Sequence, residues 1–334
     1  MSQFDPNGVG VKGTLFGLPY SLEEADIVVL PIPWDVTVSF GTGTSEAPDA
    51  ILDASSQIDY FRLDKKHAWK TKVAMAEVPE VWLAKGRALR QKAELYIDWL
   101  ENGSEPNLSL QMENIRIEIN EECAQLNEYV RQETSYWRAK GKKTILLGGD
   151  HSTPLGHISA IANEQQIGVL QIDAHADLRK AYEGFEYSHA SIMQNALQAE
   201  GVDSIVSVGV RDLCEEEALL IRKDSRVTCF FDQRVKERLF HGESWSIVCH
   251  EIISSLPDEV YLSVDIDGLD PSHCPNTGTP VPGGMSFDQL KFLITQLKLS
   301  GKTIVGADLV EVGSEEWDAN VGARVLWEIV QLIG

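Results

Sequence analysis

Short apolar runs alternate with longer segments of helical periodicity along most of the chain. The runs cover residues 26–33, 72–78, 144–149, 167–173, 204–210, 227–232, 260–267 and 303–312. Several runs are hydrophobic at every position, which is typical of strands that are buried on both faces of a sheet. Strands that alternate with helices in this way predict an α/β protein. We expect a three-layer αβα domain around an eight-stranded parallel sheet with right-handed crossovers.

Two of the intervening segments show where a helix should begin and end. Residues 286–301 start with Ser286, a favourable N-cap residue, and close on Gly301, while residues 188–201 close on Gly201. We expect a helix in each segment. Because the chain shows neither internal repeats nor a clear linker, we expect residues 1–334 to form a single domain.

The segment 85–140 differs from the rest of the chain. It holds two long helical patterns on either side of a polar loop, ENGSEPNLS. In the second pattern, five apolar residues fall on one face, namely Ile119, Cys123, Leu126, Val130 and Trp137. We interpret this stripe as a face that packs against the sheet, and a surface for a partner is the alternative.

The charge balance excludes some classes of partner. The chain has 29 basic and 51 acidic residues, which gives a net charge of −22. Nucleic acids and anionic membranes require a basic surface, so we expect neither as a partner. The excess of negative charge mildly favours a cationic substrate or metal ions, although solubility alone would explain it.

The cysteines and the start of the chain indicate a compartment. The five cysteines are scattered without a C-x-x-C pair, which predicts free thiols in a reducing environment. The first residues lack the basic start and apolar core of a signal peptide, and no apolar run approaches the roughly 20 residues of a membrane span. We therefore expect a cytoplasmic protein.

Candidate metal ligands lie where three of the predicted strands end. They are His151 after the run 144–149, Asp173, His175 and Asp177 after the run 167–173, and Asp265 and Asp267 at the end of the run 260–267. Residues two apart on an extended strand point the same way, and open α/β sheets build their sites at the carboxyl ends of strands. Carboxylate and imidazole ligands suit Mn²⁺, Fe²⁺, Zn²⁺ or Ni²⁺ better than Ca²⁺ or Mg²⁺. This number of ligands suits two ions about 3.5–4 Å apart.

Before His151, the glycine pair Gly148-Gly149 should let the backbone turn sharply and approach whatever is bound.

Three motifs in a fixed order identify a family. GGDHS (148–152), DAHAD (173–177) and SVDIDGLDP (263–271) resemble the signatures of the ureohydrolases, the arginase–agmatinase family. The resemblance extends to SFGTGTSEAPDAIL (39–52), NTGTPVPGG (276–284) and GADLVEV (306–312), and it covers nearly the whole chain except 85–125. It implies an arginase-like fold, a homo-oligomer (trimer or hexamer) and a role in polyamine and arginine metabolism.

The resemblance also implies a role for each matching residue. One Mn²⁺ would be bound by His151, Asp173, Asp177 and Asp265, and a second by Asp173, His175, Asp265 and Asp267, so that Asp173 and Asp265 bridge the two ions. Ni²⁺ is the alternative metal. A hydroxide between the ions would attack the guanidinium carbon and release urea and an amine.

The resemblance implies that His189 protonates the leaving amine or shuttles protons, and that Glu311 binds the guanidinium, while Asp177 counts among the catalytic residues as well as the ligands. A carboxylate at the end of the last strand offers bidentate acceptors for a planar cation. The simpler alternatives are a helix-capping surface histidine and an exposed strand-end charge.

The residues after Asp177 bear on the substrate. Arginine-specific members commonly carry a short polar stretch there with an asparagine two residues on, whereas this chain has Leu178 and Arg179. The departure favours hydrolysis of agmatine to putrescine over that of arginine. Guanidinobutyrate, arginine, formiminoglutamate and free guanidine remain open. Arg179 would either pair with a substrate carboxylate or form a structural ion pair.

Two other classes of function could share some of these motifs. Binuclear phosphoesterases place D-x-H first and G-N-H later, whereas here GGDHS precedes DAHAD and no G-N-H occurs. A non-catalytic paralogue would usually have lost ligands, and none of the candidate ligands is missing. Both alternatives are therefore disfavoured.

Overall fold

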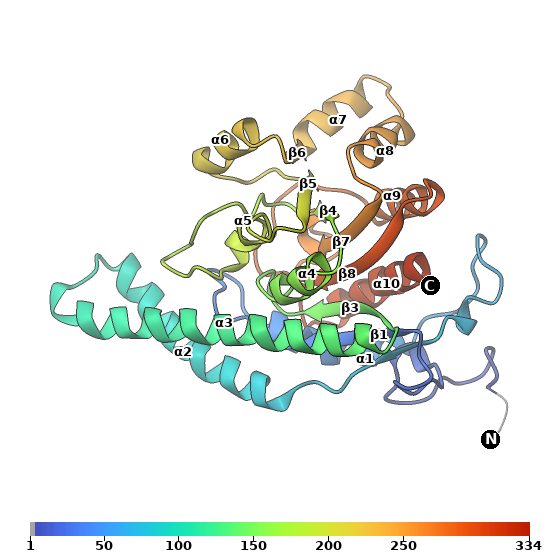
Figure 1. Cartoon of the computed structure of the whole chain (residues 1–334), viewed down its shortest axis with the longest axis horizontal. Helices are drawn as coiled ribbons and strands as arrows, with labels where there is room; N and C mark the ends of the chain where they lie inside the picture. The colour runs from blue at the N-terminus through green and yellow to red at the C-terminus, as the bar shows by residue number, and fades with distance from the viewer. Residues whose placement is uncertain (1–3) are drawn as a thin grey trace.

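Eight strands form one parallel sheet at the centre of the computed structural model, which describes residues 4–334 (Figure 1). They are β1 (Ile27–Ile32), β2 (Val73–Met75), β3 (Lys143–Gly148), β4 (Ile167–Ile172), β5 (Val202–Val208), β6 (Val227–Phe230), β7 (Glu259–Asp265) and β8 (Thr303–Val310). Their order across the sheet is β2-β1-β3-β8-β7-β4-β5-β6, and every neighbouring pair is parallel. Each strand lies where an apolar run predicted one, so the fold class is confirmed.

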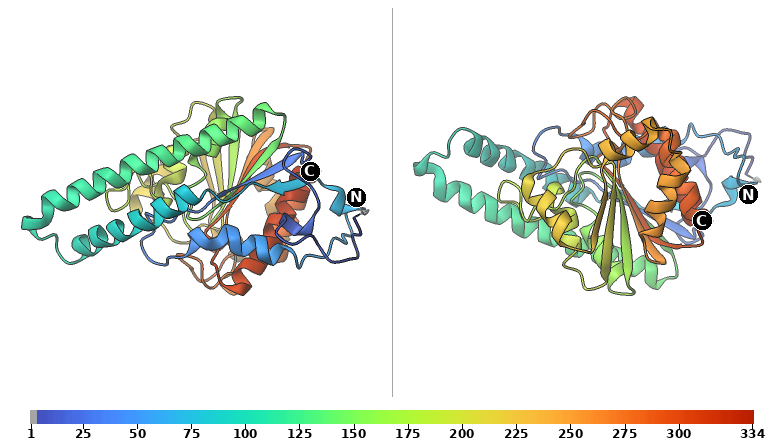
Figure 2. Two further views of the ribbon diagram at one scale, coloured as in Figure 1. Left: turned by 90° about the horizontal axis from the view of Figure 1, so that it is seen from below. Right: turned by 90° about the horizontal axis from the view of Figure 1, so that it is seen from above.

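Helices cover both faces of the sheet (Figure 2). One face carries α1 (Ala47–Ser55), α7 (Asp232–Phe240), α8 (Trp245–Ser254), α9 (Phe287–Leu299) and α10 (Glu316–Ile333). The other carries α2 (Glu80–Glu101), α3 (Ser109–Ala139), α4 (Leu155–Ala162), α5 (Ile192–Ala196) and α6 (Glu215–Lys223). Short 3₁₀ turns lie at Leu15–Gly17, Thr44–Glu46, Ala68–Lys70, Pro106–Leu108, His189–Ser191 and Ile266–Gly268.

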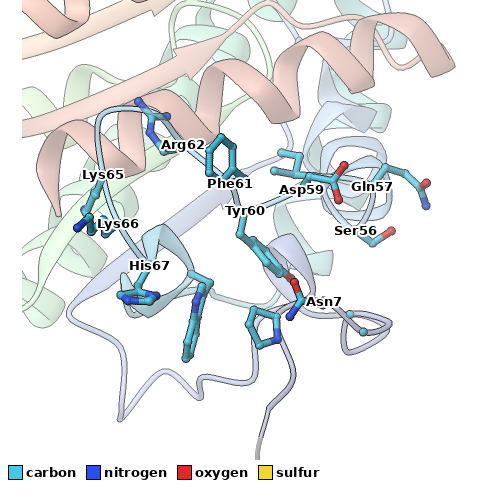
Figure 3. Close-up of a pocket in the computed structure, with 15 residues that line it drawn as sticks. Asn7, Ser56, Gln57, Asp59, Tyr60, Phe61, Arg62, Lys65, Lys66 and His67 are labelled. Atoms are coloured by element: carbon cyan, nitrogen blue, oxygen red, sulfur yellow. The ribbon is translucent and has the colours of Figure 1, made fainter.

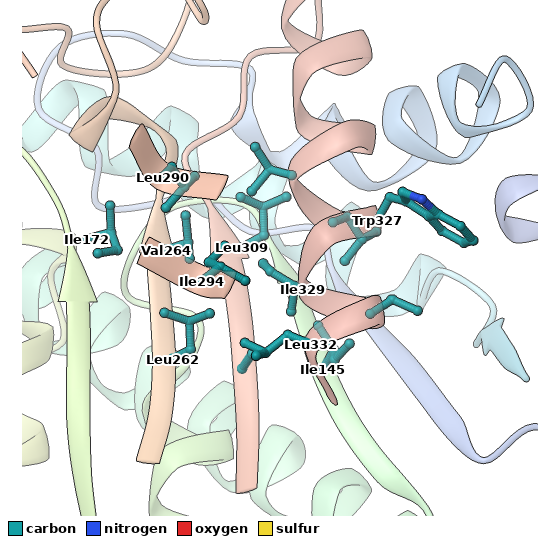
Figure 4. Packing of buried hydrophobic residues seen from close by; sticks show 14 of the residues in the cluster. Ile145, Ile172, Leu262, Val264, Leu290, Ile294, Leu309, Trp327, Ile329 and Leu332 are labelled. Carbon is teal, nitrogen blue, oxygen red and sulfur yellow. The ribbon is translucent and has the colours of Figure 1, made fainter. Parts of the chain in front are cut away.

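The core under α9 and α10 shows why the strands read as continuous apolar runs. Leu262, Val264 and Leu309 of the central strands pack against Leu290 and Ile294 of α9 (Figure 4). Successive residues of one strand face opposite layers, and both layers are apolar. Among the helices of the described residues, none is long and apolar enough to cross a membrane. All five cysteines are free, as predicted.

Of the two helices predicted from their end residues, one is confirmed and the other is shorter than predicted. α9 begins after Ser286, whose side chain accepts a hydrogen bond from the amide of Gln289 in a capping box. The helix predicted over 188–201 is reduced to a 3₁₀ turn and α5. At its start the amides of Met193 and Gln194 bond to the carbonyl of Asp177, and after Ala196 the amides of Gln198 and Ala199 bond to the third residue back in place of the fourth. Gly201 is not a helix cap: a Cβ atom there would collide with the carbonyl oxygen of Ala162.

The segment 85–140 forms an antiparallel hairpin of α2 and α3 that extends beyond the sheet (Figure 2). The apolar stripe of α3 is buried within the chain. Ile119, Cys123, Leu126 and Val130 join a cluster with residues of α2, while Trp137 packs on β1. The stripe therefore packs inside the molecule, as predicted, although its first four residues face α2 as well as the sheet.

Candidate metal centre

The four central strands bring the predicted ligands to one edge of the sheet. His151 follows β3, Asp173 follows β4, Asp265 ends β7, and Glu311 follows β8. These strands are direct neighbours in the order β3-β8-β7-β4. Because all of them are parallel, their carboxyl ends meet at the same edge, as the sequence predicted.

The ligand atoms form two groups that share Asp173. In the first group, His151 Nδ1 lies 3.0 Å from Asp173 Oδ2, 3.0 Å from Asp177 Oδ2 and 3.3 Å from Asp265 Oδ2. In the second group, His175 Nδ1 lies 3.1 Å from Asp267 Oδ2 and 3.6 Å from Asp173 Oδ1. Each oxygen of Asp173 thus faces a different histidine, which is the geometry of a carboxylate between two cations.

The surroundings of His151 leave one ring nitrogen free for a cation. Nε2 lies 3.0 Å from the hydroxyl of Ser263, which in turn donates to Asp308 Oδ1 at 3.0 Å. This chain of hydrogen bonds favours the tautomer with its proton on Nε2. Nδ1 is buried among the carboxylates and has no hydrogen bond of suitable geometry to any residue within 4–334. The lone pair of Nδ1 faces carboxylate oxygens and is repelled by them. A cation bound between these atoms would turn the repulsion into attraction.

The charges of the cluster also fit divalent cations. Burial and the neighbouring carboxylates raise the pKa of Asp177 to about 7 and that of Asp265 well above its usual value. Burial alone would lower the pKa of His175, but Asp173 and Asp267 raise it to about 12. Without a cation, the carboxylates therefore hold protons on the cluster. The protons relieve the repulsion between neighbouring carboxylates. Divalent ions relieve the same repulsion when they displace the protons.

Hydrogen bonds fix the orientation of the aspartates. Gln171 Nε2 donates to Asp173 Oδ2 at 2.7 Å, and the amide of Ala174 donates to Asp267 Oδ1 at 3.0 Å. Asp265 faces the first group through Oδ2, while its Oδ1 accepts the amide of Asp267 at 2.8 Å. The sharing of Asp173 is thus visible in the geometry, whereas Asp265 as a second bridge stays a prediction.

Glu311 is buried at the rim of the cluster. Its side chain is only 3% exposed, so the alternative of an exposed strand-end charge is wrong. Oε1 accepts the amide of His151 at 2.8 Å, while Oε2 has no hydrogen-bond partner among the described residues. Burial and the nearby Asp150 raise the pKa of Glu311 well above its usual value. This oxygen is itself buried, and Glu311 does not line the cavity that His175 and Asp177 border, so its contact with a substrate stays a prediction.

Two residues of the centre adopt a backbone conformation that only glycine adopts easily. Asp177 has φ 53° and Glu311 has φ 60°. The surrounding structure must hold a non-glycine residue in this conformation. Phe16, His67, Ser104 and Glu183 also adopt it, so it does not by itself mark the functional site. Both residues were predicted to be catalytic from the sequence.

The glycine pair before His151 serves protein packing. A Cβ atom on Gly149 would collide with the carbonyl oxygen of Trp34, and one on Gly148 would collide with the hydroxyl of Thr153. The predicted close approach therefore exists, but it is an approach of the chain to itself. The expectation that these glycines also let the backbone approach a bound group stays a prediction.

His189 lines a cavity of about 160 Å³ beside the ligand groups. We call this cavity the mouth of the centre; its lining also includes His175, Asp177, Arg179, Tyr182 and Asp212. Ser188 caps the 3₁₀ turn that His189 begins, so the alternative of a helix-capping surface histidine is wrong. Burial and the charge of His175 lower the pKa of His189 to about 4, which leaves the imidazole neutral near pH 7.

Arg179 is tied to protein groups at the same mouth. Its guanidinium carbon lies 4.8 Å above the ring of Tyr182, and its Nε lies 3.8 Å from Glu217 Oε2. Glu217 also accepts the amides of Leu178 and Cys214 at 3.0 and 2.8 Å. These contacts favour the structural ion pair over pairing with a substrate carboxylate.

Sequence reasoning missed several residues around the centre. Asp212 and Tyr182 line the mouth, and Ser263 and Asp308 support His151 from below. Three of them had a detectable signal. Asp212 is a carboxylate just beyond a strand end, while Ser263 and Asp308 are polar residues inside otherwise apolar strands. Tyr182 lies in a loop whose position no local pattern predicts.

A larger hollow of about 1050 Å³ shares no residue with this mouth. Parts of the N-terminal segment and of residues 56–69 line it, including Arg62, Lys65, Lys66 and His67 (Figure 3). None of the predicted site residues lines this hollow. The chemistry of the side chains, and not the size of the cavity, therefore identifies the functional site.

An αβα sheet with two groups of histidine and aspartate ligands at its carboxyl edge defines a binuclear metal hydrolase. The family model described as "Arginase family" matches residues 25–331. The chain therefore belongs to the Arginase family and is a ureohydrolase, a hydrolase that acts on the C–N bonds of guanidino compounds.

Individual relatives give a finer comparison. The chain is 34% identical over 297 residues to the N(1)-aminopropylagmatine ureohydrolase of Thermus thermophilus, covering 88% of this chain and 84% of the relative. It is 27% identical to the agmatinase of Bacillus subtilis, covering 92% of each. Among solved structures, the agmatine ureohydrolase of Thermoplasma volcanium matches with a TM-score of 0.71 at 24% identity, covering 99% and 96% of the two chains.

Proposed function

We propose that the chain hydrolyses the guanidino group of a substrate without a carboxylate, with agmatine as the first candidate and putrescine and urea as products. The observation that supports a two-metal reaction is the pair of ligand groups joined by Asp173. When bound, two divalent ions supply hydroxide near neutral pH by lowering the pKa of water. We propose Mn²⁺, and the ligand set also accepts Ni²⁺.

In this proposal, His151, Asp173, Asp177 and Asp265 hold one ion, and Asp173, His175, Asp265 and Asp267 hold the other. Glu311 orients the substrate: its unpartnered Oε2 accepts a hydrogen bond from the planar guanidinium. Pairing with that cation lowers the raised pKa of Glu311 and favours its charged form. The neutral imidazole of His189 would accept the proton that the attacking hydroxide gives up as the new C–O bond forms, and would pass it to the nitrogen of the leaving amine as the C–N bond breaks.

The mouth of the centre supports a cationic substrate. Arg179, the basic side chain there, is engaged by Glu217 and Tyr182, whereas Asp212 is an exposed carboxylate. A carboxylate at the entrance attracts the distal ammonium of agmatine and repels the carboxylate of guanidinobutyrate.

N(1)-aminopropylagmatine is the second candidate substrate. The curated relatives in Thermus thermophilus and Synechocystis carry its name, at 34% and 26% identity. The sequence motifs had not suggested it. A longer cationic tail would extend outward past Asp212, which the exposed position of this side chain permits.

A substrate panel tests the proposal. Purified protein loaded with Mn²⁺ is given agmatine, N(1)-aminopropylagmatine, guanidinobutyrate, arginine and guanidine, and urea is measured; with formiminoglutamate, formamide is measured instead. We expect the highest kcat/KM for one of the first two compounds. A higher kcat/KM for a carboxylate substrate would refute the substrate assignment. The absence of product from every compound, despite bound metal, would refute the enzymatic proposal.

The Asp212→Asn variant tests the role of the mouth. Loss of one exposed charge attraction is expected to raise KM for agmatine about three- to fivefold and to leave kcat nearly unchanged. KM for guanidinobutyrate should fall, because a repulsive charge is removed. Glu216→Gln, which removes an exposed carboxylate of α6, is the matched control. Equal changes for both substrates would contradict the assigned role.

A further inference from the structure

The hairpin of α2 and α3 contacts the loop that joins Asp177 to His189. This loop contains a tight reverse turn. The amide of Tyr182 donates to the carbonyl of Phe185 at 3.1 Å, and the amide of Phe185 donates back at 2.8 Å. The two residues between them, Glu183 and Gly184, have φ 53° and 82°. This is the left-handed two-residue turn that closes a β-hairpin.

Both helices of the hairpin hold this turn. Asn120 of α3 donates to the carbonyl of Gly184 at 3.0 Å and accepts the amide of Glu186 at 2.8 Å. Arg116, one turn earlier, donates to the same carbonyl at 3.3 Å. Phe185 is fully buried between the helices, with its ring centre 5.3 Å from that of Tyr96 of α2.

The turn carries one side chain of the mouth and leads to another. Tyr182 supports the guanidinium of Arg179 and lies edge-on to His189, with ring centres 6.2 Å apart. The chain then reaches His189 within a few residues. Any displacement of the turn therefore moves the wall of the mouth and the residue to which we assign proton transfer.

We infer that the α2–α3 hairpin positions the catalytic loop, and that Arg116 and Asn120 are positioning residues for the reaction. The inference rests on the proposed function in so far as that function makes His189 catalytic. A loop with few anchors opens easily, and a misplacement of about 1 Å can reduce a rate about 10²-fold. The hairpin thus adds anchors to a loop that is otherwise held by Asn195 of α5, which donates to the carbonyl of Glu186 at 2.9 Å.

The chain offers a matched pair of variants for a test. Arg116 pairs with Glu113 and Arg131 pairs with Glu128, both three residues apart on α3, but only Arg116 reaches the loop. Arg116→Ala and Asn120→Ala are therefore compared with Arg131→Ala. Amide hydrogen exchange of residues 182–188, bound metal, kcat and KM are measured for each. Asn120→Asp, which keeps the acceptor for Glu186 but removes the donor to Gly184, is the partial-rescue variant.

We expect Asn120→Ala to speed exchange in the loop and to lower kcat/KM at least about tenfold, with bound metal unchanged. Arg116→Ala should speed loop exchange and lower kcat/KM as well, but less than Asn120→Ala does. The exchange rate and kcat/KM of Asn120→Asp should lie between those of Asn120→Ala and those of the wild type. Exchange and kinetics equal to those of Arg131→Ala would overturn the inference. If Asn120→Ala does not fold, Arg116→Ala supplies the same comparison, because the side chain of Arg116 is 26% exposed and forms only one hydrogen bond to the loop. The exchange measurement tests whether the hairpin anchors the loop, and it does not depend on activity. A wild-type protein that released no urea would refute only the proposed function.

Discussion

The Asp173→Asn variant is expected to lose tightly bound metal and at least about 10³-fold in kcat. Asp173 is the residue that both ligand groups share, with one oxygen 3.0 Å from His151 Nδ1 and the other 3.6 Å from His175 Nδ1. Asparagine keeps the shape but offers one neutral oxygen, so the centre loses a charge and a bridge at once. Stabilisation by metal ions amounts to several kcal/mol, and each 1.36 kcal/mol is tenfold in rate.

The measurement is the metal content per chain after dialysis, followed by kcat with added Mn²⁺. Asp270→Asn is the matched control: this aspartate belongs to the same signature, but its Oδ1 accepts the amide and hydroxyl of Ser272 at the surface. We expect the control to keep its metal and its activity. A dialysed Asp173→Asn protein with two ions per chain would contradict the assignment of Asp173 as a bridge.

The arrangement of the ligands could be predicted because short-range rules govern it. Asp173 and His175 share a face because residues two apart on an extended chain do so. His151, Asp173 and Asp265 come together because parallel strands present their carboxyl ends at one edge. These rules place the ligands at one edge of the sheet. Their contact also requires that β3, β8, β7 and β4 lie side by side, and this order of the strands was not predicted.

The remaining parts of the site depend on contacts between distant segments. The helix predicted over 188–201 is shorter in the structure. Its α-helical part begins late because the carbonyl of Asp177 accepts the amides of Met193 and Gln194, a contact that local propensity does not predict. Tyr182 lines the mouth from a turn that Arg116 and Asn120 of α3 contact, and these residues are distant in the sequence. His151 contacts Ser263, and Ser263 donates to Asp308 of the neighbouring strand. The sequence could indicate these contacts only by showing one polar residue inside each of two apolar runs.

The His189→Ala variant is expected to lower kcat about 10²- to 10³-fold while bound metal and KM stay close to those of the wild type. The side chain lines the mouth beside His175 and Asp177, and it belongs to neither group of ligand atoms. Its loss therefore removes a proton carrier without removing a metal ligand. Added imidazole should restore part of the rate, because a small base can occupy the space that the ring leaves.

The pH dependence gives an independent check on the same residue. The pKa of His189 is lowered from the usual 6.5 to about 4, so its neutral form persists as the pH falls below 6.5 and is lost only near pH 4. An acid limb of kcat that reports His189 should therefore lie below pH 6.5, at pH values where the bound metal is retained, and be absent from His189→Ala. His241→Asn, at an exposed histidine after α7, serves as the control and should leave the profile unchanged. If His189→Ala kept kcat within about threefold of the wild type, proton transfer would have to occur through another group.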